Sequence, residues 1–256
     1  MRGLQGKVAV VVGAGNALGI GEGTARRLAQ EGCSVVLADV NLSGAQANAE
    51  KINAAGGQAH ALHVDLADEA SVKQMVEGAV KRYGRIDSMF VNAADTNIRQ
   101  RDFDAIRVET EVFDQTISIG LRGHLLCTRY CLPVMLENGG GTIIYTSSDA
   151  AFTPMGHYPS YNMAKAGVTA LMRHVVTKWG KENIRANCIS PGLILTDTVL
   201  RDHTEESKAM ILGRIKSPRL GSPDDIAGMV AFLASDDAAW VLGQVISVNG
   251  GDLMRW

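Results

Sequence analysis

The chain has 256 residues, of which 46% are hydrophobic and 20% are charged, a composition typical of a globular rather than a disordered protein. Its 25 basic residues against 27 acidic residues leave a net charge of −2, the wrong sign for a protein that binds nucleic acid by neutralising phosphates. The polar stretch Met1 to Lys7 opens no signal peptide and no apolar run is long enough to span a bilayer, so we expect a cytoplasmic protein with no membrane partner.

Short apolar runs rich in Val and Ile alternate with stretches of helical periodicity along the whole chain. We expect strands, buried on both faces, at Val8–Val12, Ser34–Ala38, His60–Val64, Ser88–Val91, Thr142–Tyr145, Arg185–Ile189 and Val245–Val248. We expect helices at Gly23–Gln30, Ala45–Ala55, Ala70–Arg82, Phe113–Leu136, Tyr158–Trp179 and Asp224–Ala234. The alternation predicts the α/β class: a single doubly wound Rossmann domain over residues 1–256, with a parallel seven-stranded sheet flanked by helices on both faces.

Two segments interrupt this alternation. Asp95 to Thr110 is polar and charged, and Thr196 to Gly221 is longer and contains an amphipathic patch of Met210, Ile211 and Ile215. Ligands bind beyond the carboxyl ends of the strands in open α/β sheets, so substrate contacts are expected in these segments. Ordinary surface loops would explain the extra length equally well.

The first predicted strand runs into a glycine-rich turn, residues Gly13 to Gly21, and a helix follows. Glycines there let the backbone approach a pyrophosphate at a helix N-terminus, although glycine also serves other tight turns. The second predicted strand ends in Asp39, about 20 residues further on, where a carboxylate can accept hydrogen bonds from an adenosine ribose. Asp39 would repel a 2′-phosphate and no basic residue accompanies it, which favours NAD over NADP. A solvated aspartate at a strand end is the alternative.

Tyr161 and Lys165 are four residues apart and therefore share one face of a predicted helix. An ammonium group one turn away stabilises the phenolate and would let Tyr161 exchange a proton with a substrate hydroxyl. Ser148 closes the preceding predicted strand, 13 residues earlier, so it can meet Tyr161 over one reacting oxygen. The alternatives are a core tyrosine beside a surface lysine and a serine in an ordinary turn.

With these residues in order, the chain resembles the short-chain dehydrogenase/reductases from about Lys7 to Asp252. Gly13 to Gly21 is similar to the family's T-G-x-x-x-G-x-G turn, and Ser148, Tyr161 and Lys165 fall on its catalytic serine, tyrosine and lysine. Asp65-Leu66 resembles the pair that contacts adenine, and Asn92-Ala93-Ala94 resembles the N-A-G segment. Pro191-Gly192 with Thr196 resembles the P-G-x-x-x-T stretch. Arg219-Leu220-Gly221 and Asn249-Gly250-Gly251 resemble the C-terminal signatures.

The resemblance implies a set of residues that bind the cofactor. They are Gly13, Gly15, Gly19, Ile20, Asp39, Asp65, Leu66, Asn92, Ala93, Tyr161, Lys165, Pro191, Gly192, Ile194 and Thr196.

The sequence departs from the family pattern at three places. Val12 stands where the family has Thr, and two extra residues separate Gly13 from Gly19, so a register that begins at Gly15 is equally open. Ala94 replaces the third residue of N-A-G. Gly120 occupies the position of the family's catalytic asparagine, which is thought to anchor a water that relays protons to the lysine; glycine there also permits a kink in the helix.

The resemblance implies an NAD(H)-dependent oxidoreductase that interconverts a secondary alcohol and a ketone. Ser148 would hold the substrate oxygen, Tyr161 would exchange its proton, and Lys165 would support the phenolate and bind the nicotinamide ribose. Two rivals stay open: a 3-oxoacyl thioester reductase, which usually takes NADPH and which Asp39 disfavours, and a non-catalytic nucleotide-binding sensor, which only Gly120 favours.

The expected partners are a small-molecule alcohol or ketone and further copies of the chain. Phe152, Met155, His157 and Tyr158 lie between the predicted serine and tyrosine and would line a mostly apolar substrate pocket. Relatives form homotetramers through two long helices. The apolar faces of Phe113–Leu136 and Tyr158–Trp179 agree with that, as they would with core packing.

The cysteines do not predict a metal site. Cys33, Cys127, Cys131 and Cys188 include no C-x-x-C pair, and no histidine cluster accompanies them. We expect them to be buried as small hydrophobic residues in a reducing compartment.

Overall fold

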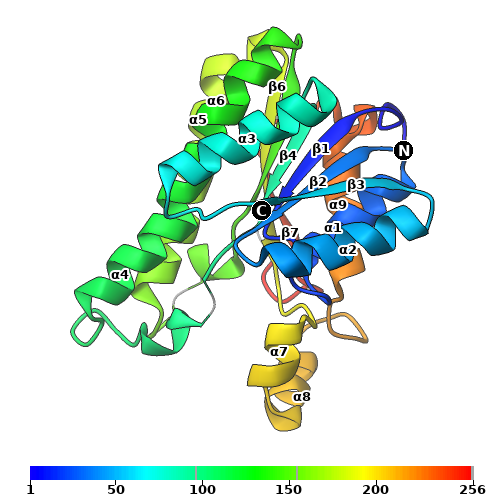
Figure 1. Ribbon diagram of the computed structural model, residues 1–256. Helices are drawn as coiled ribbons and strands as arrows, with labels where there is room; N and C mark the ends of the chain where they lie inside the picture. The colour runs from blue at the N-terminus through cyan, green and yellow to red at the C-terminus, as the bar shows by residue number, and fades with distance from the viewer. Residues whose placement is uncertain (96, 154, 255–256) are drawn as a thin grey trace.

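The protein is described by a computed structural model, which covers residues 1–95, 97–153 and 155–254. Its strands form one parallel seven-stranded sheet in the order β3-β2-β1-β4-β5-β6-β7 (Figure 1), so the predicted fold class is confirmed. The strands are β1 (Val8–Val12), β2 (Ser34–Asp39), β3 (Gln58–His63), β4 (Ser88–Val91), β5 (Gly141–Thr146), β6 (Ile184–Pro191) and β7 (Val245–Val248).

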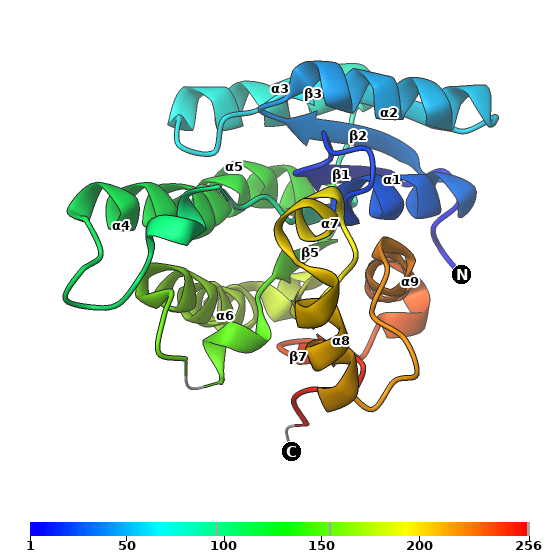
Figure 2. The ribbon, with the colours of Figure 1, turned by 90° about the horizontal axis from the view of Figure 1, so that it is seen from below.

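The helices form two layers, one on each face of the sheet (Figure 2). The layer of α1 (Ile20–Gln30), α2 (Leu42–Ala54) and α9 (Pro223–Ala234) lies opposite the layer of α3 (Glu69–Tyr83), α5 (Gly123–Glu137) and α6 (Pro159–Trp179). The remaining helices are α4 (Thr110–Ile117), α7 (Asp197–Asp202) and α8 (Glu205–Arg214).

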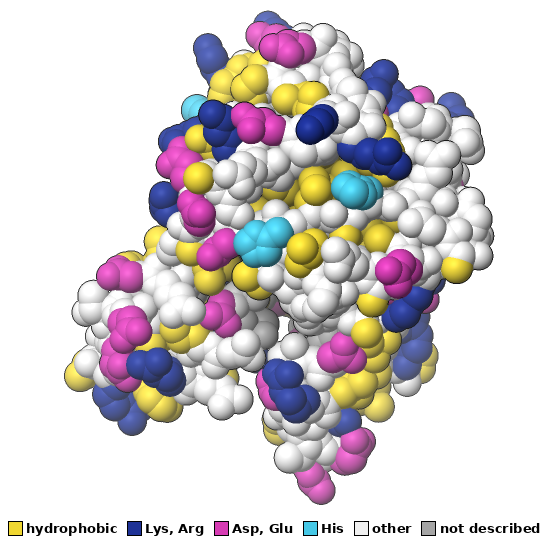
Figure 3. All heavy atoms as spheres, viewed as in Figure 1, with side chains coloured by type: hydrophobic (Ala, Val, Ile, Leu, Met, Phe, Trp, Pro, Cys, Tyr) yellow, Lys and Arg dark blue, Asp and Glu magenta, His cyan; other side chains and the backbone are white. Residues whose placement is uncertain are grey.

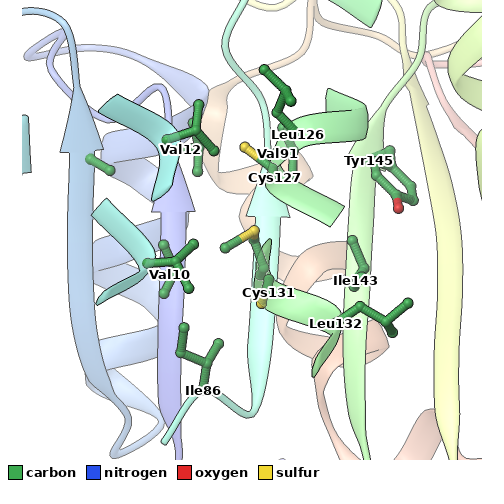
Figure 4. Close-up of a cluster of buried hydrophobic side chains, with 14 of the residues drawn as sticks. Val10, Val12, Ile86, Val91, Leu126, Cys127, Cys131, Leu132, Ile143 and Tyr145 are labelled. Carbon is green, nitrogen blue, oxygen red and sulfur yellow. The ribbon is translucent and has the colours of Figure 1, made fainter. Parts of the chain in front are cut away.

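Each strand contributes alternate side chains to two separate cores, because successive residues of a strand point to opposite faces. Val10 and Val12 belong to the core under α3, α5 and α6, and Figure 4 shows them with Leu126 and Cys131 of α5. Val11 belongs to the core under α1, α2 and α9. All four cysteines are buried, as expected, and Cys127 and Cys131 lie in the same core as Val10 and Val12 (Figure 4). Burial on both faces explains why the strands read as continuous apolar runs.

The central strands end at the same level. Val12, Val91 and Tyr145 are register partners across β1, β4 and β5, so the segments that follow them leave the sheet at one edge. α4 on one side and α7 with α8 on the other project beyond this edge (Figure 1). This is where ligands bind in open α/β sheets.

Three predicted segments differ in detail from the structure. The helix expected over Phe113–Leu136 is divided into α4 and α5 by a π-helical turn, Ser118–Arg122. The segment Thr196 to Gly221 contains α7 and α8, and Asp95 to Thr110 contains a short 3-10 helix, Ile98–Arg101. No helix within the described ranges is both long and apolar enough to cross a bilayer.

Candidate active site

A cleft of about 760 Å³ opens at the carboxyl edge of the sheet. It is lined by residues that follow the first six strands, together with residues of α6 and α7. In Figure 3 the surface is hollowed between the lobe that carries α4 and the lobe that carries α7 and α8. The sheet edge thus forms the floor of the cleft, and the two projecting lobes form its sides.

Nearly all residues that the sequence analysis selected line this one cleft. They are Ser148, Tyr161, Lys165, Gly13, Gly19, Ile20, Asp39, Asp65, Leu66, Asn92, Ala93, Pro191, Gly192, Ile194 and Thr196. Gly15 does not line it. Phe152, Met155, His157 and Tyr158, expected around a substrate, are not among the lining residues either.

The glycine-rich turn is built around Gly13. Its φ of +90° suits only glycine, and an added Cβ would come within 2.7 Å of the Ala93 backbone nitrogen. The α1 helix begins after Gly19, and no side chain caps its first N–H groups. The turn therefore leaves a backbone cradle in front of an uncapped helix N-terminus, with Gly13 and Gly19 facing the cleft.

Gly15 supports Asp39 from behind the cleft. The Gly15 N–H donates to Asp39 Oδ2 at 2.7 Å, and the Asn41 N–H donates to Oδ1 at 2.9 Å. A Cβ on Gly15 would lie 2.7 Å from the Asp39 carboxyl carbon, so any larger residue would displace this carboxylate. The sequence left open whether the glycine motif begins at Gly13 or at Gly15. In the structure Gly13 forms the turn, and Gly15 packs against Asp39.

Lys165 is buried at the centre of the cleft. Its side chain donates from Nζ to the Thr146 carbonyl at 2.8 Å, and the residue is 2% exposed. Burial lowers the pKa of Lys165 to about 8. The Nζ atom lies 5.7 Å from the centroid of the Tyr161 ring, so the ammonium group and the phenol are close neighbours in the cleft.

Asp102 holds the first turn of α6, which carries Tyr161. Its carboxylate accepts from the N–H groups of Ser160 and Tyr161 at 3.3 and 3.0 Å and from the Ser160 hydroxyl at 2.9 Å. The residue that precedes the helix, Tyr158, has a φ of 64° and makes no side-chain cap. Asp102 is 1% exposed, so this buried carboxylate caps the helix from a distant segment.

The role of Asp102 as a cap of α6 was not predicted from the sequence. The pattern of a cap places Ser, Thr, Asp or Asn directly before the helix, whereas Asp102 lies 58 residues before Ser160. Its only signal was a position within the polar segment Asp95 to Thr110.

A family model described as Enoyl-(Acyl carrier protein) reductase matches residues 13–252. A 7alpha-hydroxysteroid dehydrogenase of Bacteroides fragilis is 34% identical over 98% of this chain and 96% of its own length. The chain belongs to the short-chain dehydrogenase/reductase family. It is therefore an oxidoreductase of that family, and its fold places it there as well.

A solved structure and another curated relative are also similar to this chain. A solved 7 alpha-hydroxysteroid dehydrogenase complexed with NADH and 7-oxo glycochenodeoxycholic acid has a TM-score of 0.92 at 33% identity, covering 99% of this chain and 96% of that one. A 3-oxoacyl-[acyl-carrier-protein] reductase of Thermotoga maritima is 32% identical over 97% of this chain and 98% of its own length.

Gly120 lies within the π-helical turn between α4 and α5, where the short-chain dehydrogenase/reductase pattern has asparagine. The glycine is buried, and an added Cβ would meet only the Ala164 Cβ, at 3.3 Å. In a π-helical turn the backbone hydrogen bonds join residues five apart instead of four, so the regular α-helical pattern is interrupted there. The helix is thus irregular at Gly120, the position where a kink was considered.

His124 follows Gly120 by one helical turn and is wholly buried, with neither ring nitrogen hydrogen-bonded among the residues that the structure describes. Burial lowers the pKa of His124 to about 3, helped by the Lys165 charge and opposed by the carbonyls of Ile119 and Val91. The imidazole is therefore neutral, and it lies close enough to Lys165 to be affected by its charge. Its position within an apolar helix gave no sign of this in the sequence.

We expect a Gly120→Asn variant to remain soluble and active, with stability lowered by about 1–3 kcal/mol and a small change in kcat. Only the Ala164 methyl group, 3.3 Å away, must give way to the new Cβ. Thermal denaturation and steady-state kinetics check this. Gly120→Ala is the matched control, since it adds the Cβ alone. Loss of soluble protein in both variants would contradict the expectation and assign the glycine to packing.

Proposed function

We propose that the protein is an NAD(H)-dependent dehydrogenase that interconverts a secondary alcohol and a ketone, with Ser148, Tyr161 and Lys165 as its catalytic residues. The observation that carries the proposal is the buried Lys165 ammonium beside the Tyr161 ring, in the cleft that Ser148 also lines. Retention of all three groups in one cleft argues against the non-catalytic sensor.

The residues of the cleft fit a nicotinamide dinucleotide. Gly13 and Gly19 form a backbone cradle at the uncapped N-terminus of α1, which suits a pyrophosphate. Asp39 faces the same cleft 24 residues beyond Gly15 and suits an adenosine ribose. We infer that Asp65, Leu66, Asn92, Ala93, Pro191, Gly192, Ile194 and Thr196 complete the binding site, and Gly15 supports it through Asp39.

The bound dinucleotide supplies the hydride acceptor for oxidation and the hydride donor for reduction. In oxidation, the Ser148 hydroxyl donates a hydrogen bond to the substrate oxygen, and the Tyr161 phenolate takes the substrate's hydroxyl proton. Lys165 stabilises that phenolate through its charge, because its ammonium group is held in place by the Thr146 carbonyl in a site without bulk water. In reduction, Tyr161 returns the proton.

NAD(H) is proposed over NADP(H) because Asp39 would meet a 2′-phosphate with a like charge. The similar solved hydroxysteroid dehydrogenase is complexed with NADH, and we infer the same cofactor here. The cleft gains no compensating cation from the glycine turn or from residues 40–42.

The wild type is expected to have a higher kcat/KM with NADH than with NADPH, and Asp39→Ala should reduce this preference by about tenfold or more, chiefly by improving NADPH. Steady-state kinetics with both cofactors at one fixed substrate concentration measure it. Asp39→Asn is the control, because it removes the charge but keeps one acceptor oxygen, for either the Gly15 or the Asn41 N–H group. A wild type that prefers NADPH would overturn the assignment.

The 3-oxoacyl thioester reductase is the second candidate, and the Thermotoga maritima relative favours it. A single screen separates the candidates: cyclic and aromatic alcohols and ketones and acetoacetyl-coenzyme A, each with NAD(H) and NADP(H). Turnover confined to the thioester with NADPH would replace the first proposal with the second. The homotetramer expected from the family is tested separately by light scattering.

A further inference from the structure

Arg99 brings a positive charge into the cleft beside Tyr161. Its guanidinium carbon lies 5.0 Å from the centroid of the Tyr158 ring and 5.8 Å from that of the Tyr161 ring. The residue is half-buried and lines the cleft together with Ser148 and Tyr161. Two aromatic rings therefore hold this cation next to the proposed site of proton transfer.

The other arginines of this segment have acidic partners. Arg101 pairs with Glu109 at 2.5 Å, and Arg107 pairs with Asp104 at 2.6 Å. Arg99 makes no ion pair within 4.0 Å with any residue in the described ranges. Its charge in the cleft is thus left without a close counter-ion, which costs free energy in a half-buried position.

Two acidic side chains, Asp95 and Asp202, also line the cleft, and both have other hydrogen-bonding or ion-pair partners. Asp95 accepts from the Gln115 side-chain amide at 2.7 Å and from the Asn97 N–H at 2.9 Å. Asp202 on α7 pairs with Arg201 at 2.7 Å, and Arg99 attracts it only at longer range. Neither acid therefore occupies the guanidinium of Arg99.

A guanidinium group presents its N–H donors as a planar fork that matches a carboxylate and binds it through two parallel hydrogen bonds. Each such bond spans about 2.9 Å. Because the guanidinium carbon is 5.8 Å from the Tyr161 ring centroid, a carboxylate on Arg99 and a carbinol oxygen at Tyr161 fit within one small molecule.

We propose that Arg99 is a specificity-determining residue that binds a carboxylate of the substrate. The substrate class is then a secondary hydroxy acid, or the corresponding oxo acid, with its carboxylate a few bonds from the reacting carbon. This inference rests on the proposed function, since Tyr161 defines where the reacting carbon lies. It adds to that function a polar contact that an uncharged alcohol cannot make.

The first test compares acids with their methyl esters, which differ only in charge at the carboxyl group. The acids are 3-oxobutanoate, 4-oxopentanoate and 4-oxocyclohexanecarboxylate, and each is paired with its methyl ester. Reduction with NADH is measured for wild type, Arg99→Gln, Arg99→Lys and Arg101→Gln. The wild type should prefer at least one acid by about tenfold or more in kcat/KM. Arg99→Gln should abolish this preference through a higher KM for the acid, with the ester unchanged, and Arg99→Lys should restore part of it.

Arg101→Gln is the matched control, because Arg101 is a surface residue of the same short helix with its own partner, Glu109. It should leave the acid-to-ester ratio at the wild-type value. An ester preferred in every pair would overturn the inference. An equal loss for acid and ester in Arg99→Gln would also overturn it, because Arg99 would then act on Tyr161 rather than on the substrate.

The second test measures binding without turnover, so that it does not depend on the proposed reaction. Calorimetry with the NAD⁺-loaded protein compares binding of the same oxo acids and esters, which NAD⁺ cannot reduce, to wild type and Arg99→Gln. Tighter binding of an acid by wild type alone supports the carboxylate site even if no pair is reduced, in which case only the proposed function fails. Equal affinity of acid and ester in wild type refutes the carboxylate site whatever the turnover.

Discussion

A Tyr161→Phe variant is expected to lose about 10²–10⁴-fold in kcat while binding NADH almost as the wild type does. The phenol oxygen is the proposed proton acceptor for the substrate hydroxyl, and phenylalanine keeps the ring that packs beside Lys165 and Arg99. Steady-state kinetics with the best substrate of the screen measure the loss, and NADH fluorescence titration measures cofactor binding.

Tyr83→Phe serves as the control for this variant. Tyr83 ends α3, is not among the cleft residues, and should retain full activity after the same loss of a hydroxyl. If Tyr161→Phe retained a tenth of the wild-type kcat, Tyr161 would not be the acid/base, and the proposed mechanism would be wrong. A variant that lost both turnover and NADH binding would indicate instead that the site had collapsed.

An Asp102→Ala variant is expected to be strongly destabilised and to lose activity even where it is folded. The substitution leaves the N–H groups of Ser160 and Tyr161 and the Ser160 hydroxyl without their buried acceptor. A lost cap costs about 0.5–2 kcal/mol and a buried unpaired polar group about 1–3 kcal/mol, so we expect a loss of about 2–5 kcal/mol. For a chain of this size that lowers Tm by roughly 5–15 °C.

Activity tests whether Asp102 positions Tyr161 or only stabilises the fold. At a temperature where the variant is folded, kcat should fall by about tenfold or more, because a misplaced proton acceptor loses alignment with the substrate. Asp102→Asn keeps one acceptor oxygen and should recover part of both losses. Asp114→Ala, at an exposed position of α4, is the matched control and should change stability by less than about 0.5 kcal/mol. An unchanged Tm and kcat in Asp102→Ala would refute the role of the cap.

The sequence alone determined the sheet and the close pairing of Tyr161 with Lys165, because both depend on short-range regularities. Strands buried on both faces need continuous apolar runs, such as Val8–Val12, and these are visible without knowing what covers them. A spacing of four residues on a helix fixes Tyr161 and Lys165 on one face, and the structure has them 5.7 Å apart from ring centroid to Nζ. The glycine turn before α1 was visible for the same reason.

Which residues of the irregular segments reach the cleft depends on how the helices and loops pack together. Asp102 meets the first turn of α6 across 58 residues of chain, and no periodicity relates the two. Arg99 and Arg101 look alike in sequence, yet one lies against the rings of Tyr158 and Tyr161 and the other pairs with Glu109 at the surface. His124 reads as one polar residue in a helix, and its burial beside Lys165 follows from how α5 packs on the sheet. Contacts of this kind depend on the relative placement of elements distant in the chain, which packing sets and local sequence patterns do not encode.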